Sequence, residues 1–104
     1  MTNTNVENMT SNSGRSVPNQ FVINTKDGMF FQSYKSVIVY IDNEGNTYLD
    51  ENKWDYSTTT GKYRNQFLNE KKRETEKKIK EGVYRLYDLN SNDAINHAFF
   101  NGGK

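Results

Sequence analysis

The chain of 104 residues contains no cysteine, one proline and one histidine. Without cysteine, disulfide bonds, cysteine-ligated zinc and thiol nucleophiles are excluded. The single histidine, His97, has no second histidine or cysteine beside which to bind a metal, so we expect no metal site. No apolar run approaches the roughly 18–20 residues that cross a bilayer, and the N-terminus lacks a basic region followed by an apolar one. We therefore expect a cytoplasmic protein with no membrane segment and no cofactor.

Apolar residues are also scarce, at 33% of the chain, but aromatic residues make up 13%. Each large ring buries about 150–250 Å², so a small core built from Phe, Tyr and Trp is feasible. A length of this order is typical of one domain. We expect a single domain over residues 19–100.

The first 18 residues are rich in Asn, Thr and Ser, and their few apolar side chains are scattered. Such a segment buries too little surface to offset the entropy lost on ordering. We expect a disordered tail over residues 1–18, the alternative being an arm that orders on a partner. The last residues, 101–104, are expected to fray.

Short β-branched runs separated by turn residues follow the tail. Asp27-Gly28 and the loop containing Gly45 are typical of hairpins, because glycine accepts the positive φ that these turns require. The junction over residues 33–36 is either a bulge or a tight turn. The pattern predicts strands near residues 20–25, 29–34, 36–42, 46–50 and 83–89.

Helical patterns occupy the second half of the chain. Ser57 or Thr58 is a suitable N-cap, and the apolar stripe of the helix that follows stops near Asn69. A second helix is expected over 72–81, ended by Gly82 in the left-handed conformation. A third is expected to begin near residue 91. Together these elements predict an α+β fold, with an antiparallel sheet of about four to five strands and two to three helices packed on one face. Its expected core comprises Phe21, Ile23, Val37, Val39, Ile41, Trp54, Phe67 and Ile79.

No motif indicates a reaction. The Thr60-Gly61-Lys62 segment lacks the first glycine of a phosphate-binding loop and the hydroxyl after its lysine. The carboxylates of the hairpin turns are typical of solvated turn residues. His97 has no serine nucleophile on a strained turn beside it. We therefore expect a protein that is not an enzyme.

Charge is unevenly distributed. Residues 62–81 hold eight basic and four acidic residues, although the net charge of the whole chain is only +1. This segment follows an aromatic group around Trp54 and Tyr56, which is either core or a stacking surface for single-stranded nucleic acid. Aromatic residues at helical spacing usually face a core, which favours the first interpretation.

Three segments resemble a family of small proteins encoded by bacteriophages and plasmids. They are residues 32–39 (QSYKSVIV), 46–49 (NTYL), and 54–63 together with 67–68 (WDYSTTTGKY and FL). The resemblance covers roughly residues 29–84. It implies a compact α+β domain and a phage or plasmid origin, and no activity. Lys62-Tyr63 stands where the family commonly has Arg-His, which would remove proton transfer from that pair.

The expected function is therefore that of a non-catalytic phage or mobile-element accessory protein that binds a host or phage protein, for example as an inhibitor of a host or defence factor. The alternative is a nucleic-acid-binding protein that uses the basic residues of 62–80. Residues of the aromatic and basic block are the candidates for partner contact: Tyr56, Thr59, Lys62, Tyr63, Arg64, Lys71, Lys72 and Arg73.

Overall fold

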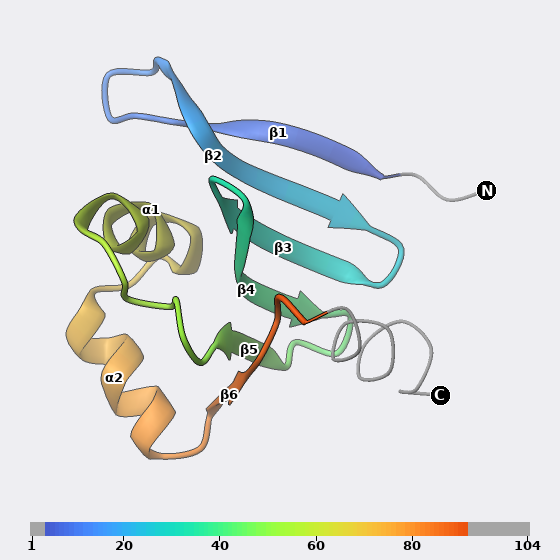
Figure 1. Cartoon of the computed structure of the whole chain (residues 1–104), viewed down its shortest axis with the longest axis vertical. Coiled ribbons are helices and arrows are strands. Elements are labelled where there is room, and N and C mark those ends of the chain that lie inside the picture. The colour runs from blue at the N-terminus through green and yellow to red at the C-terminus, as the bar shows by residue number, and fades with distance from the viewer. Residues whose placement is uncertain (1–3, 92–104) are drawn as a thin grey trace.

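The computed structural model describes residues 4–91, and its main element is a six-stranded sheet in which the strands follow chain order (Figure 1). The first five strands form an antiparallel meander, whereas the last pairs in parallel with its neighbour. Two helices make the crossover before the last strand, as a parallel connection requires. The elements are β1 (Asn5–Thr10), β2 (Ser16–Thr25), β3 (Gly28–Ser33), β4 (Ser36–Asp42), β5 (Thr47–Asp50), α1 (Thr58–Leu68), α2 (Lys72–Lys80) and β6 (Tyr84–Tyr87).

The α+β class and the predominantly antiparallel sheet are thus as predicted, but the sheet has six strands rather than four or five. Two helices lie within residues 4–91. The third expected helix falls outside the described residues, as does the expected fraying of 101–104.

The additional strand corrects the expectation of a disordered tail. β1 lies wholly within residues 1–18, and β2 begins there. A turn closed by hydrogen bonds between Ser11 and Arg15 joins the two strands, with Gly14 in the left-handed conformation. Met9 is only 6% exposed and belongs to the core. The composition of β1 does not by itself favour a strand. Its order therefore comes from pairing with β2 and from the burial of one side chain.

Both helices pack on one face of the sheet, as predicted. The helix-side core is formed by Met9, Phe31, Ile38, Val39, Leu49, Tyr63 and Tyr84. Four of the expected core residues, Ile41, Trp54, Phe67 and Ile79, are partly buried against it. A smaller cluster of Phe30, Tyr40 and Leu89 occupies the opposite face, and Ile23 and Val37 pack there instead. Phe21 is half-buried.

A bulge in β4 explains why Val37 and Val39 face opposite sides. Phe31 pairs with Val39 and Gln32 with Val37, which leaves Ile38 without an opposing residue. Because the extra residue shifts the alternation, Ile38 and Val39 both point into the helix-side core. The junction at 33–36 is a tight turn, since Ser33 pairs directly with Ser36 and Tyr34 has φ of 57°.

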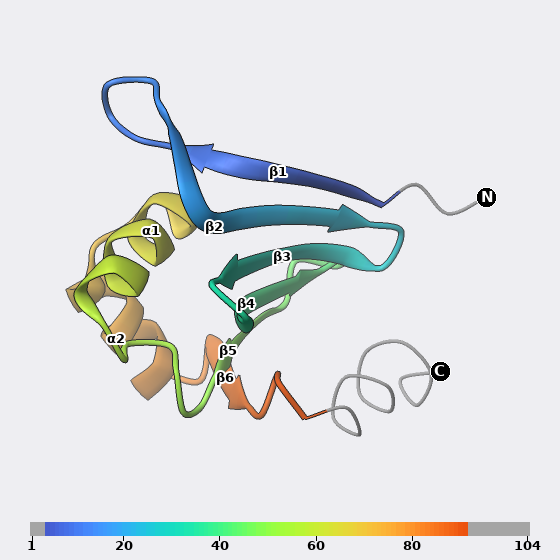
Figure 2. The same ribbon diagram turned by 45° about the horizontal axis from the view of Figure 1, so that its top comes forward.

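The helix boundaries follow the sequence closely. Ser57 is the N-cap of α1, and its hydroxyl accepts a hydrogen bond from the Thr60 amide. Asn69 ends α1 in the left-handed conformation, at φ of 57°. α2 then begins at a new angle (Figure 2). Gly82 follows α2 with φ of 81°, as predicted.

Candidate functional site

Two of the eight candidate contact residues lie inside the fold. Tyr63 is 6% exposed in the helix-side core, and Arg64 is only 1% exposed. α1 turns these two neighbouring side chains towards the sheet and the 54–55 segment rather than towards solvent. This burial removes both residues from any contact surface, which corrects the expectation for Tyr63 and Arg64.

The Arg64 guanidinium instead fixes the segment that leads into α1. Its Nη1 donates to the Trp54 carbonyl at 2.7 Å and to Asp55 Oδ1 at 3.1 Å, while Nη2 donates to Asn65 Oδ1 at 2.8 Å. The guanidinium carbon lies 5.1 Å from the centre of the Trp54 ring, a cation–π contact. Both terminal nitrogens of the buried guanidinium are therefore hydrogen-bonded, whereas its buried Nε has no partner among the described residues.

Lys72 completes this network from α2. Its ammonium lies 2.6 Å from Asp55 Oδ2, so the Asp55 carboxylate ties the start of α2 to the start of α1. Partial burial alone would raise the pKa of Asp55, but the hydrogen bonds from Lys72 and Arg64 outweigh that cost and lower the pKa below its usual value. Lys72, with its side chain 50% exposed, is therefore engaged in a surface ion pair that links the two helix starts.

A buried carboxylate, Glu70, closes the corner between the helices and β6. Glu70, with its side chain 4% exposed, accepts hydrogen bonds from Thr75 Oγ1 at 2.6 Å, Lys78 Nζ at 2.7 Å and Tyr84 Oη at 2.9 Å. Burial opposes the charge on Glu70, yet these three donors lower its pKa overall. Lys78, with its side chain 40% exposed, is thereby also engaged in an ion pair.

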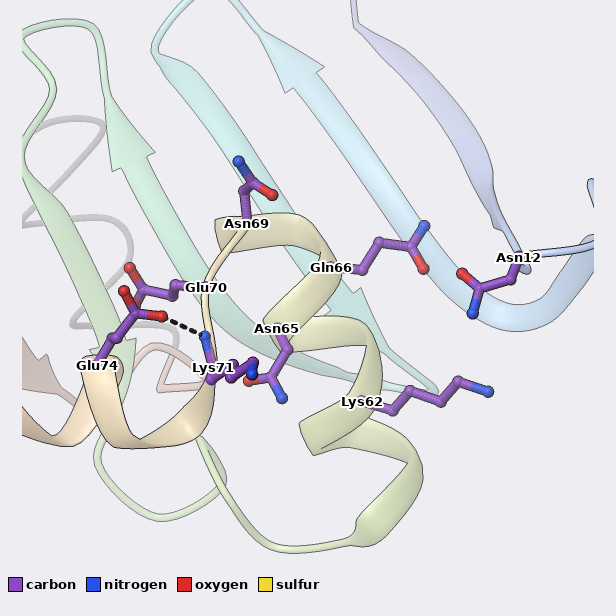
Figure 3. Close-up of a pocket in the computed structure, with 8 residues that line it drawn as sticks. All are labelled: Asn12, Lys62, Asn65, Gln66, Asn69, Glu70, Lys71 and Glu74. Carbon is purple, nitrogen blue, oxygen red and sulfur yellow. Dashed lines mark hydrogen bonds between the residues drawn. The ribbon is translucent and has the colours of Figure 1, made fainter.

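A polar hollow of about 470 Å³ lies where α1, the start of α2 and the β1–β2 loop meet (Figure 3). In Figure 3 the side chains of Lys62 and Lys71 lie on the helical side and Asn12 on the loop side. Glu74 accepts a hydrogen bond from the Lys71 backbone amide at 2.9 Å and caps α2. The hollow is lined by Asn12, Lys62, Asn65, Gln66, Asn69, Glu70, Lys71 and Glu74.

Of the two carboxylates that line this hollow, Glu70 is held in an ion pair with Lys78, whereas Glu74 accepts a backbone hydrogen bond and, among the described residues, is in no ion pair. Among residues 4–91, no carboxylate oxygen lies within 4 Å of the ammonium of Lys62 or Lys71. The Lys62 ammonium lies 5.4 Å from the centre of the Tyr63 ring, which orients it without neutralising it. The site therefore offers two cations and several side-chain amides to an acidic or polar ligand.

The remaining candidates lie outside the hollow. Tyr56 is 46% exposed, with the Lys53 ammonium 5.6 Å from its ring centre. Thr59 and Arg73 are exposed at the surface of α1 and α2. Of the eight candidates, the structure thus brings only Lys62 and Lys71 together in one site.

The eight candidates chosen from the sequence did not include the amide residues of the hollow. Lys62, Asn65, Gln66 and Asn69 are spaced i, i+3, i+4 and i+7, which places them on one face of a helix, opposite the apolar stripe. This polar stripe was the available signal. No sequence pattern indicated Asn12, because its position at the hollow depends on the β1–β2 hairpin.

Residues 4–91 show no cluster of three or more His, Asp and Glu side chains that would suit a metal ion. His97 lies outside the described residues. In the same part of the chain, neither helix has the length and apolar character of a membrane span.

No curated protein and no solved structure was found to match the chain. A family model matches residues 4–82, and so includes the β1–β2 hairpin that the sequence resemblance, confined to about residues 29–84, had left out. The chain therefore belongs to a family of unknown function, DUF8033.

Proposed function

We propose that the protein is a non-catalytic accessory protein of a bacteriophage or other mobile element, which acts in the host cytoplasm by binding a host or phage protein. The observation that carries this proposal is the polar hollow, with Lys62 and Lys71 available beside amide side chains. Amides bind the peptide groups of a loop, and two cations favour a loop with acidic side chains. The proposed ligand is therefore an acidic surface loop of the partner protein.

The charge pattern favours a protein over a nucleic acid. Of the eight basic residues in 62–81, Arg64, Lys72 and Lys78 are held in ion pairs by Asp55 and Glu70. Five basic residues remain (8 − 3) against three of the segment's four acidic residues (4 − 1, Glu70 being engaged). A net excess of two charges is small beside the six to ten phosphate contacts of dedicated DNA-binding proteins.

Affinity capture from a nuclease-treated bacterial lysate tests this proposal. The wild type is expected to retain a protein partner that Lys62→Glu/Lys71→Glu does not retain, because the double substitution reverses both cations of the hollow. Lys77→Glu/Lys80→Glu is the matched control, since it makes the same charge change on exposed positions of α2 away from the hollow. Retention that is seen only in a parallel lysate without nuclease treatment would overturn the proposal in favour of nucleic acid.

A further inference from the structure

β1 is an edge strand with an unusually unprotected sequence. It stands first in the strand order, so among the described elements only β2 pairs with it (Figures 1 and 2). Natural edge strands are commonly protected by lysine, proline or a short length. The six residues of β1 include no lysine, arginine or proline, and Glu7 carries its only charge. The opposite edge, β6, is shorter, at four residues.

Val6 marks the centre of the exposed part of this edge. Its side chain is 57% exposed, against 6% for Met9 on the same strand. It pairs with Ile23 of β2, a residue that contacts the smaller apolar cluster. A strand added beside β1 would cover Val6 and continue that apolar face.

We propose that the protein forms a two-fold symmetric dimer in which β1 pairs in antiparallel fashion with β1 of a second copy, centred on Val6. The outward backbone groups of an edge strand recur at every second residue. In a symmetric antiparallel pair, one residue must therefore lie directly opposite its own copy on the two-fold axis. Only in that arrangement do the outward N–H and C=O groups of one strand face those of the other. The centres within β1 that need testing are Val6, Glu7 and Asn8.

These three registers differ in the side chains that they bring together. A centre at Glu7 places two carboxylates directly opposite each other, which is unfavourable. A centre at Asn8 requires the stretch between Asn8 and Thr10, where a bulge interrupts the ladder. A centre at Val6 uses residues 4–8 alone and pairs Val6 with its own copy.

The Val6 register is also complementary in its polar contacts. It places Asn5 of each strand opposite Glu7 of the other, so that an amide donor meets a carboxylate. Within one chain the same two groups already bond, with Asn5 Nδ2 3.1 Å from Glu7 Oε2. Because a five-residue ladder buries little surface, we expect a weak dimer that forms at high protein concentration.

Cysteine cross-linking tests the register, since the chain has no cysteine of its own. Val6→Cys, Glu7→Cys and Asn8→Cys would be incubated in the same glutathione redox buffer. Directly opposed side chains have Cβ atoms about 4.5–5.5 Å apart, close to disulfide geometry. Val6→Cys is expected to form covalent dimer at least about tenfold faster than the other two, equivalent to 1.4 kcal/mol. Equal rates at all three positions, or a faster rate at Glu7→Cys or Asn8→Cys, would overturn the proposed register.

Sedimentation equilibrium of the intact chain tests the dimer itself. The wild type should show mass increasing towards that of two chains as concentration rises, whereas Val6→Lys should remain monomeric because two ammonium groups would meet at the axis. Val83→Lys is the matched control, since Val83 is 58% exposed and lies outside β1. Circular dichroism establishes that both variants are folded. A wild type that is monomeric throughout, or a Val83→Lys variant that dissociates equally, would refute the dimer.

Discussion

The Arg64 guanidinium donates a 2.7 Å hydrogen bond to the Trp54 carbonyl while it lies over the indole ring of the same residue. One basic side chain thus fixes both the backbone and the ring at the entry to α1. We expect Arg64→Met to lower the free energy of unfolding by about 1.5–3 kcal/mol, the usual worth of hydrogen bonds to a charged group. Urea denaturation would measure this loss. Lys62→Met, an exposed change on the same helix, should stay within about 0.5 kcal/mol. Equal effects would show that Arg64 does not anchor the segment.

The Glu70 carboxylate makes the free energy of unfolding depend on pH in the acidic range. Its pKa is lower in the folded chain than in the unfolded chain, despite burial, because Lys78, Thr75 and Tyr84 donate to it. Because the pKa is lowered, the carboxylate stabilises the folded chain at pH values above its pKa in the unfolded chain, about 4.3. This stabilisation is lost as the pH falls through the pKa of the folded chain. We expect the melting temperature to fall below about pH 4.3. Glu70→Gln should be less stable at pH 7 and show a smaller acid-induced decline. An identical decline in the two proteins would contradict this role.

Met9 should be essential to the docking of β1. Met9→Ala removes most of a buried side chain from the helix-side core and should cost about 2–5 kcal/mol. Val6→Ala on the same strand should cost less than about 0.5 kcal/mol at concentrations where the protein is monomeric, since Val6 is exposed. Thermal unfolding followed by circular dichroism measures both. If Met9→Ala had no effect, β1 would not be packed on the core.

Elements with a strong local signal were predictable from the sequence. Ser57, Asn69 and Gly82 delimit the two helices because cap chemistry acts over a few residues and needs no tertiary contact. β1 was not predictable on composition, because its order comes from pairing with β2 and from one buried methionine. Its only local signal was the turn over Ser11–Gly14.

The candidate site was predictable only in part. Lys62 and Lys71 were identified from charge, and the structure places both at the hollow. Arg64 carries the same charge two residues after Lys62, but helical geometry turns it inward, where Trp54 and Asp55 provide partners. The charges in a sequence do not reveal which basic side chains form ion pairs within the folded chain. That assignment requires the three-dimensional positions of the acidic residues.

Nucleic-acid binding should be weak. With three of its eight basic residues in ion pairs, the 62–81 segment has few cations left for phosphates. We expect no micromolar binding of labelled duplex or single-stranded DNA near physiological salt, as measured by fluorescence anisotropy. Tight binding that weakens steeply with added salt would contradict this expectation and support the alternative function.

The most direct test of the proposed function is calorimetric titration of the purified partner with the wild type and two double variants. Lys62→Glu/Lys71→Glu should raise the dissociation constant by at least about tenfold, a loss of 1.4 kcal/mol, because it places two carboxylates where the partner's acidic loop binds. Lys77→Glu/Lys80→Glu, with the same change in net charge, should leave the dissociation constant within about twofold of the wild type. Equal weakening by both pairs, or weakening by the control pair alone, would show that the hollow is not the binding site.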